Sequence, residues 1–230
     1  MDPKTPRLSP KALAKYIDHT LLRPDAADAD LRRVCDEARE FSFCTVCVYW
    51  HQIPKIAAWL EGTGVLPIAV VGFPGGEVPT QEKVSETHQA VAAGAREIDM
   101  VLNRPLFRRD PRAALADVRA VVEAAAPHPV KLILETSELS QDEKVAACRL
   151  AVEAGAAWVK TSTGFSKSGA TAEDVRLMKA TVGERARVKA SGGIRSFETA
   201  WAMIQAGAER LGTSASAAII AGAGAAGDGY

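Results

Sequence analysis

The sequence carries no excess of either charge. Its 28 Lys and Arg residues equal its 28 Asp and Glu residues, so the formal net charge is zero. A nucleic-acid-binding domain normally has a basic excess, and a charged interaction tail shows as a block of like charge. Because the sequence has neither feature, we expect no nucleic-acid partner.

Cysteine, histidine and long apolar runs are also scarce. Four cysteines in 230 residues are too few for the disulfide framework of a small secreted domain, and the four histidines lack paired metal-ligand spacing. No apolar run is long enough to cross a bilayer, and the first ten residues lack the apolar core of an export signal. We therefore expect a cytoplasmic enzyme with no metal site and no membrane partner.

Short apolar or β-branched segments alternate with helical patterns from one end of the chain to the other. Near-continuous apolar runs of this length are typical of parallel strands buried on both faces. The predicted strands are Tyr16–Thr20, Cys44–Val48, Leu66–Gly72, Glu97–Leu102, Val130–Glu135, Ala157–Ser162, Arg187–Ser191 and Arg210–Thr213.

The intervening segments carry signals for the start and end of helices. Ser9 precedes a proline at the first helical position, and Ser140 stands three residues before Glu143, the spacing of a capping box. Three glycines in an Ala-Gly-Ala context stand where a helix should end before the next strand: Gly94, Gly155 and Gly207. The recurrence indicates a repeated βα unit.

Eight strands that alternate with helices leave two architectures, an open doubly wound sheet or a closed (β/α)8 barrel. The strand count favours the barrel, as do the polar residues at the C-terminal ends of many strands, where barrel active sites lie. No shift in composition and no Pro/Ser linker marks a domain boundary. We predict an α/β protein with one TIM-barrel domain, residues 1–230, and a short N-terminal helix.

Three lysines occupy strand interiors. Lys131, Lys160 and Lys189 each follow a valine, and they are separated by 29 and 29 residues, about one βα unit each. A lysine is almost never fully buried without a partner, so any one of them alone could simply extend its ammonium to a strand end. Three at equivalent positions on consecutive strands point to one face, and we expect their amines to converge at one mouth of the barrel.

Converging amines have a chemical consequence. A second ammonium and desolvation both lower the pKa of a lysine, and a neutral amine can attack a carbonyl to form a Schiff base. Asp99, a carboxylate inside an apolar strand, needs a positive partner. We expect it to pair with one of the lysines and to pass protons through water, although a purely structural salt bridge is the alternative.

Glycine and hydroxyl residues cluster after the last three predicted strands. Such loops let backbone N–H groups approach an anion, and barrels often bind phosphate with the loops after strands 7 and 8. The residues concerned are Thr163, Gly164, Gly192, Gly193, Arg195, Gly212 and Ser214. They predict a phosphate site.

Cys44 and Cys47 have the spacing of a redox CxxC motif. In a strand, however, an offset of three places the two thiols on opposite faces. We therefore expect Cys44 in the core and Cys47 facing the site.

Eight sequence motifs resemble those of the deoxyribose-phosphate aldolases, and they occur in the same order as in that family. Between about residue 16 and residue 216 the sequence contains, in this order, YIDHTLLRPDA, TVCVY, VVGFPGG, AREIDMVLN, VKLILETSELS, WVKTSTGF, VKASGGIR and ERLGTSAS. The resemblance implies a TIM-barrel class I aldolase that uses no metal or other cofactor. It also implies reversible cleavage of 2-deoxy-D-ribose 5-phosphate to glyceraldehyde 3-phosphate and acetaldehyde. Because family members are often dimers or tetramers, it predicts a homo-oligomer that acts on small phosphosugar and aldehyde substrates.

The resemblance further implies roles for individual residues. Lys160 resembles the Schiff-base lysine, Lys189 the ammonium that lowers its pKa, Asp99 the proton-transfer carboxylate and Lys131 the lysine that supports it. The terminal Tyr230 is similar to a family tyrosine that reaches the site. Positions similar to those that bind substrate or its phosphate are Asp18, Thr20, Cys47, Gly164, Gly192, Gly193, Arg195 and Ser214.

The chain departs from the family pattern near the predicted substrate pocket. Trp50 stands where proline is usual, Phe165 where some members have a phosphate-binding lysine, and Ala215 where some have a hydroxyl. The lysine pair and Asp99 are intact.

Two other functions compete with an aldolase. A phosphosugar isomerase or epimerase could use the same barrel, with a metal or a Glu or His base at the strand ends. A phosphosugar-binding barrel without catalysis would leave the lysines with no need to be reactive.

Overall fold

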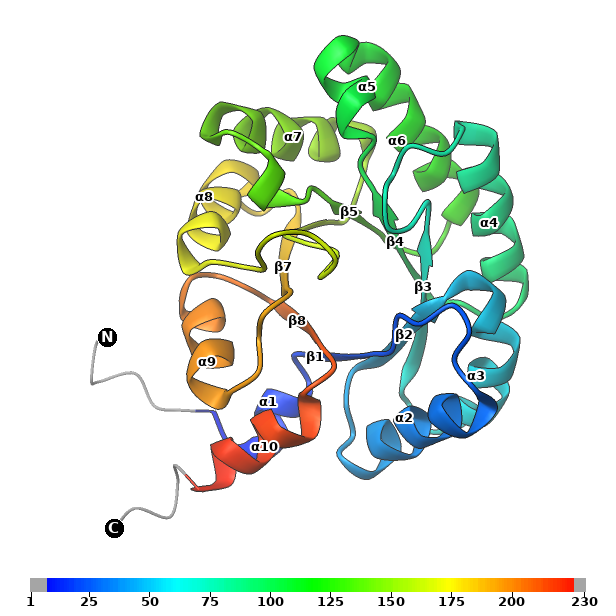
Figure 1. The fold of residues 1–230 in the computed structure, drawn as a ribbon, viewed down its shortest axis with the longest axis vertical. Helices are drawn as coiled ribbons and strands as arrows, with labels where there is room; N and C mark the ends of the chain where they lie inside the picture. The colour runs from blue at the N-terminus through cyan, green and yellow to red at the C-terminus, as the bar shows by residue number, and fades with distance from the viewer. Residues whose placement is uncertain (1–7, 226–230) are drawn as a thin grey trace.

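The computed structural model describes residues 8–225. Within them, eight parallel strands close into a barrel in the order in which they occur along the chain, and helices surround it (Figure 1). This confirms the predicted (β/α)8 barrel, and each predicted strand overlaps its observed counterpart. The strands are β1 (Ile17–Thr20), β2 (Thr45–Tyr49), β3 (Leu66–Val71), β4 (Glu97–Val101), β5 (Val130–Ile133), β6 (Trp158–Lys160), β7 (Arg187–Ser191) and β8 (Arg210–Thr213).

The helices begin where the sequence places capping side chains. Ser9 accepts a hydrogen bond from the backbone of Ala12 at the start of α1, and Ser140 with Glu143 forms the predicted capping box of α7. The helices are α1 (Pro10–Ala14), α2 (Asp28–Glu40), α3 (Ile53–Leu60), α4 (Thr80–Ala92), α5 (Arg104–Arg109), α6 (Pro111–Ala125), α7 (Gln141–Ala154), α8 (Ala172–Val182), α9 (Phe197–Gln205) and α10 (Ser216–Ala225), with 3-10 turns η1 (Trp50–Gln52) and η2 (Thr136–Glu138).

The short helix α1 precedes the barrel, as predicted, and packs against α10 at the other end of the chain (Figure 1). None of the helices in residues 8–225 is both long and apolar enough to span a membrane. Tyr230 lies outside the described residues.

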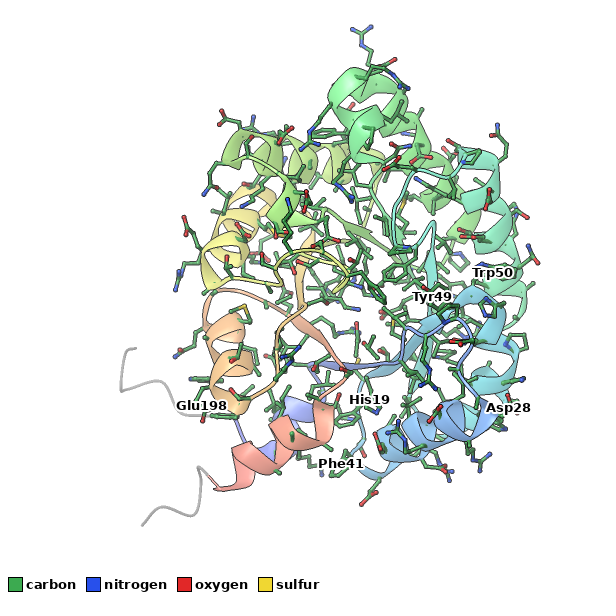
Figure 2. The ribbon with its side chains drawn as sticks, in the orientation of Figure 1. His19, Asp28, Phe41, Tyr49, Trp50 and Glu198 are labelled. Atoms are coloured by element: carbon green, nitrogen blue, oxygen red, sulfur yellow. The ribbon has the colours of Figure 1, made fainter. Side chains whose placement is uncertain are left out.

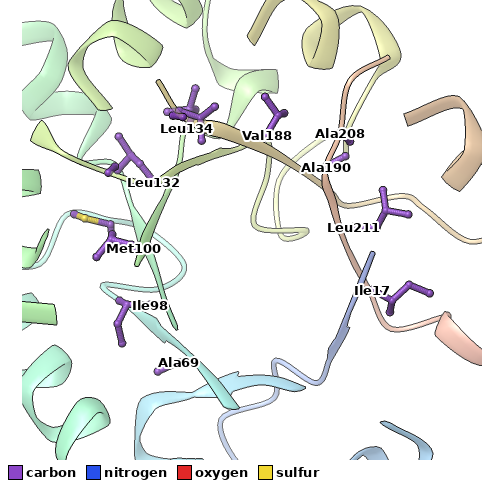
Figure 3. Close-up of a cluster of buried hydrophobic side chains, with 14 of the residues drawn as sticks. Ile17, Ala69, Ile98, Met100, Leu132, Leu134, Val188, Ala190, Ala208 and Leu211 are labelled. Atoms are coloured by element: carbon purple, nitrogen blue, oxygen red, sulfur yellow. The ribbon is translucent and has the colours of Figure 1, made fainter. Parts of the chain in front are cut away.

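The main apolar core lies between the barrel and its helices. Strand side chains alternate between two faces, so Ile98 and Met100 of β4 pack into this outer core, part of which is drawn in Figure 3. Val188 and Ala190 of β7 do the same. The residues between them, such as Asp99 and Lys189, therefore face the interior of the barrel.

The interior itself has an apolar side and a charged side. Cys47 of β2 and Ile68 and Val70 of β3 form a small separate apolar cluster. Buried polar and charged residues occupy the other strands, including Asp99 and Lys189, both of which are 0% exposed. A TIM barrel is usually filled by layers of branched apolar side chains, so charged groups in this position need a specific explanation.

Candidate active site at the carboxyl end of the barrel

A cavity of about 270 Å³ opens beside the loops that follow β1, β6, β7 and β8. The carboxyl ends of the parallel strands lie at one face of the barrel, so these loops meet there. The wall also contains Leu22, Phe165, Ser191, Ile194 and Thr213. The predicted site residues that line the cavity are Thr20, Lys160, Thr163, Gly164, Gly192, Gly193, Arg195, Gly212 and Ser214.

Asp99 binds all three of the predicted lysines. One carboxylate oxygen, Oδ2, accepts hydrogen bonds from Lys160 Nζ and Lys189 Nζ, each at 2.8 Å. The other, Oδ1, lies 3.0 Å from Lys131 Nζ. All four side chains are buried, and only Lys160 among them lines the cavity. The expected convergence is therefore present, and its centre is one carboxylate.

The three lysines do not occupy equivalent positions, contrary to the equal spacing of 29 residues. Lys160 and Lys189 are direct partners across β6 and β7, but Lys160 pairs with Ile133 on β5. Lys131 lies two residues earlier on that strand, opposite Asp99. Neighbouring strands in a closed barrel are staggered, so equal spacing along the chain does not give equal height in the barrel.

The surroundings of Lys160 favour its neutral amine. Burial lowers its pKa below the ordinary 10.5, and repulsion from Lys189 lowers it further, whereas Asp99 opposes both effects. Burial is thus the larger cause, and the neighbouring ammonium adds to it. A neutral Lys160 is a nucleophile that faces the cavity.

The partners of Lys160 remain charged. Burial raises the pKa of Asp99, but the three lysines outweigh it and hold that pKa well below its usual range. Burial lowers the pKa of Lys189, but Asp18 and Asp99 outweigh it and raise that pKa. The pKa values of the two adjacent lysines are therefore shifted in opposite directions, which favours a neutral amine at Lys160 and an ammonium at Lys189.

Besides Asp99 and Lys189, three other predicted site residues are absent from the cavity wall. Asp18 faces Lys189 at 2.5 Å, and Lys131 forms ion pairs with Glu97 and Asp99. Cys47 is buried in the interior apolar cluster, and burial raises the pKa of its thiol to about 11. The prediction for Cys44 was wrong: it is only half-buried, because it stands before β2 begins.

The loops after β6 and β7 approach one another backbone to backbone. Gly192 has φ +86°, and a Cβ at Gly169 would lie 2.0 Å from the carbonyl oxygen of Gly192. Only glycine permits this contact, which brings the β6 loop over the barrel opening (Figure 1). Ser191 Oγ, in the cavity wall, is buried without a hydrogen-bond partner. It is available to a bound anion or hydroxyl group.

Glu135 supports the β6 loop, a role the motifs did not reveal. Its carboxylate accepts hydrogen bonds from the backbone N–H of Thr163 at 3.2 Å and from Ser166 Oγ at 2.8 Å. Glu135 is 2% exposed and has φ +61°, in the left-handed region. A carboxylate at the end of the apolar predicted strand Val130–Glu135 was the signal available in the sequence.

His19 fixes the start of α10, which follows the β8 loop. Its Nδ1 bonds Ser216 Oγ at 2.8 Å, and its Nε2 bonds Glu37 of α2 at 2.7 Å, so it lies between the two helices (Figure 2). The side chain alternates with Asp18 and Thr20, so it points out of the barrel. It therefore supports the β8 loop without reaching the cavity.

Aromatic side chains from separate loops meet near the cavity. Phe165 of the β6 loop is 59% exposed, and its ring lies 5.4 Å from that of Phe73. Phe73 in turn contacts Tyr49 at the end of β2, beside Trp50 (Figure 2). Across residues 8–225, no three His, Cys, Asp or Glu side chains are grouped to hold a metal ion.

The chain is similar to known aldolases in sequence and in fold. It matches the DeoC/LacD family aldolase model over residues 12–227. A deoxyribose-phosphate aldolase from Brevibacillus brevis is 50% identical over 217 residues, which cover 94% of this chain and 98% of the relative. Deoxyribose-phosphate aldolase 1 from Mesoplasma florum is 53% identical over 213 residues, which cover 91% and 96%. The tetrameric structure of deoxyribose phosphate aldolase from Aeropyrum pernix has a TM-score of 0.88 at 34% identity, covering 94% of this chain and 92% of that one.

Gly212 leaves the space that the Lys189 side chain occupies. A Cβ at Gly212 would lie 2.2 Å from Ser191 Oγ and 3.0 Å from Lys189 Cε, and Lys189 cannot retreat because its Nζ is held by Asp18 and Asp99. Since overpacking costs about 1–3 kcal/mol, we expect Gly212→Ala to lower the thermal unfolding midpoint by about 2–10 °C. Gly75→Ala is the matched control, because nothing lies within 4 Å of that site. Equal midpoints for the two variants would contradict this packing role.

Proposed function

The chain belongs to the DeoC/LacD family of aldolases, and from that premise we propose that Lys160 cleaves 2-deoxy-D-ribose 5-phosphate by forming a Schiff base with it. As an aldolase the protein is a carbon–carbon lyase, and the products are glyceraldehyde 3-phosphate and acetaldehyde. One observation supports the assignment most directly. Lys160 alone of the three lysines faces the cavity, and burial and Lys189 both lower its pKa.

The reaction begins at the open-chain aldehyde of the sugar. The lone pair of neutral Lys160 Nζ attacks C1 to give a carbinolamine. Its hydroxyl group takes up a proton from solvent and leaves as water, which gives an iminium ion. The iminium nitrogen carries a positive charge that the amine lacked, and Lys160 Nζ lies 2.8 Å from Asp99 Oδ2. The ionised Asp99 therefore stabilises the charge where it develops, as expected of a preorganised site.

The iminium then accepts the electrons of the C2–C3 bond. The C3 hydroxyl gives its proton to a water held by Asp99, C3 becomes the aldehyde of glyceraldehyde 3-phosphate, and the two-carbon fragment stays on Lys160 as an enamine. Protonation at C2 and hydrolysis release acetaldehyde and restore the amine. Asp99 acts through charge and through this water, because its low pKa makes it a weak base on its own.

The glycine-rich loops of the cavity wall suit the phosphate. Gly192, Gly193 and Ser214 line the cavity, and α10 begins two residues after Ser214. Glycine loops and helix N-termini both favour anions. The exposed Arg195 adds a positive charge at the wall. With phosphate here and C1 at Lys160, the sugar spans the cavity.

The competing functions lack a comparable observation. An isomerase or epimerase, or a barrel that only binds phosphosugars, gives no reason for Lys160 to lose its proton. The proposed steps use side chains and water, without a cofactor.

We further propose a homo-oligomer, a dimer or a tetramer, in the cytoplasm. A tetrameric relative from Aeropyrum pernix supports the assembly, and the four unpaired cysteines are compatible with a reducing compartment. Light scattering on the purified protein should give a mass of two or four chains, and a monomer at micromolar concentration would contradict the assembly.

Replacing Lys160 should remove the nucleophile, whereas replacing Lys189 should change the pKa of Lys160. Lys160→Ala should lower turnover by at least about a thousandfold, since the covalent nucleophile is lost. Lys189→Met should raise the pKa of Lys160, because repulsion ends and Asp99 loses a competing cation. Its rate at neutral pH should fall about tenfold per unit of pKa and recover at higher pH. Rate against pH, with borohydride trapping of the acetaldehyde adduct on Lys160, measures both effects.

Lys167 provides the matched control for that experiment. It lies in the same loop as Phe165, but its side chain is 86% exposed and its nearest carboxylate, on Glu138, is 3.9 Å away. Lys167→Ala should therefore keep the rate and its pH dependence. An adduct that persists in Lys160→Ala would sink the assignment of the nucleophile.

A negative charge at Ser214 should distinguish phosphorylated from unphosphorylated substrate. Ser214→Asp repels the phosphate, and a loss of about 1.4 kcal/mol in binding raises KM about tenfold. The KM for unphosphorylated 2-deoxyribose should stay unchanged, because that substrate brings no charge to the loop. Steady-state kinetics with both substrates provides the test, and an equal rise in both KM values would place the phosphate elsewhere.

A further inference from the structure

Six buried side chains form a closed ring of alternating charge inside the barrel. Within the ring, each carboxylate contacts two cations and each cation contacts two carboxylates. In order, this charge ring consists of Asp18, Lys189, Asp99, Lys131, Glu97 and Arg210, which returns to Asp18. The N···O distances are 2.5, 2.8 and 3.0 Å, then a close Lys131–Glu97 pair, then 3.4 and 2.7 Å.

The charge ring is balanced without Lys160. Its three carboxylates and three cations have a formal sum of zero, and Lys160 joins it only through Asp99. A protonated Lys160 would therefore give this cluster a net charge of +1, whereas a neutral amine leaves it at zero. Because an uncompensated charge is unfavourable in a buried site, the ring favours loss of the proton from Lys160 rather than from its own members.

We propose that Glu97 and Arg210 are positioning residues that control the charge state of Lys160 from the opposite end of the barrel. They begin β4 and β8 and are absent from the cavity wall, with exposures of 6% and 8%. They act by completing the charge ring, which keeps Asp18 and Lys131 paired. The inference rests on the proposed function of Lys160.

Stability alone does not explain the charge ring, because buried ion networks can often be replaced by apolar side chains without loss of stability.

 
A packing role would be met equally well by neutral side chains of the same volume. Arg210 already packs against an aromatic side chain, because its guanidinium lies 5.0 Å from the ring centroid of Trp158. The charge of Arg210 adds electrostatic control of the ionisable groups that lie nearer the cavity, including Lys160.

The other charged or titratable groups that face these residues are few. Lys160 faces Asp99, Lys189 and the thiol of Cys47, and Arg210 faces Asp18, Glu97 and Cys44. Burial raises the pKa of both thiols, which keeps them neutral near pH 7. The balance of charge around Lys160 therefore depends on the ring itself.

The positions of Glu97 and Arg210 permit a matched comparison. β4 and β8 each lie two strands from β6, on opposite sides, or about 10 Å at the usual strand spacing. At an effective dielectric constant of about 20, a unit charge at that distance changes a pKa by about one unit. Glu97→Gln removes a negative charge and should lower the pKa of Lys160, whereas Arg210→Met removes a positive charge and should raise it.

The experiment measures Lys160 directly in the full-length protein. Each variant is mixed with acetaldehyde across a pH series and quenched into borohydride at one common pH, and peptide mapping gives the fraction of Lys160 reduced. Circular dichroism at each pH confirms that the variant is folded. We expect the midpoint of adduct formation to move about one pH unit down in Glu97→Gln and about one unit up in Arg210→Met.

Two further variants separate charge from shape. Glu97→Gln/Arg210→Met restores a neutral ring and should return the midpoint to the wild-type value. Arg210→Lys keeps the charge and should do the same. If Arg210→Met does not fold, Glu97→Gln still decides the question, because the amide preserves the side-chain shape and an accepting oxygen.

The outcomes also distinguish this inference from the proposed function. Midpoints that stay at the wild-type value, or that move in the same direction in both single variants, would overturn the role of the charge ring. Absence of an adduct on wild-type Lys160 would instead overturn the Schiff-base assignment.

Discussion

The central constraint in this barrel is the compensation of buried positive charge by Asp99. Lys131, Lys160 and Lys189 could not all be buried without a carboxylate between them, and Asp99 contacts each one. In the proposed mechanism, the same carboxylate has two opposing effects on catalysis. It raises the pKa of Lys160, which disfavours the nucleophilic amine, and it stabilises the iminium ion that the amine becomes. Burial and Lys189 must outweigh the first effect for the second to be useful.

Strand alternation lets one barrel serve two purposes. On β7, Val188 and Ala190 pack against the helices, while Lys189 and Ser191 face the interior and the cavity. The apolar residues that stabilise the fold thus hold the polar ones in position without sharing their face. Gly212 shows how closely the two requirements meet, since a single methyl group there would intrude on Lys189.

Local patterns in the sequence predicted the strands, the helix caps and the inward face of the lysines, because each depends on residues close together in the chain. They did not predict that Lys131 lies at a different height, since stagger between strands is a property of the closed barrel. Nor did they reveal the pairing of Arg210 with Asp18, which joins residues 192 positions apart. The contact of His19 with Ser216, 197 positions apart, escaped for the same reason.

The charged interior also limits where chemistry can occur. Five of the six ring members each pair with two opposite charges and form no ion pair with a residue of the cavity wall, whereas the sixth, Asp99, also pairs with Lys160. An ammonium that contacts one carboxylate gives up its proton more readily than an ammonium that contacts two. Lys189 contacts both Asp18 and Asp99, whereas Lys160 contacts Asp99 alone. In the proposed mechanism, the number of carboxylates that each lysine touches, rather than its depth in the barrel, therefore distinguishes Lys160 as the nucleophile from Lys189 as the cation.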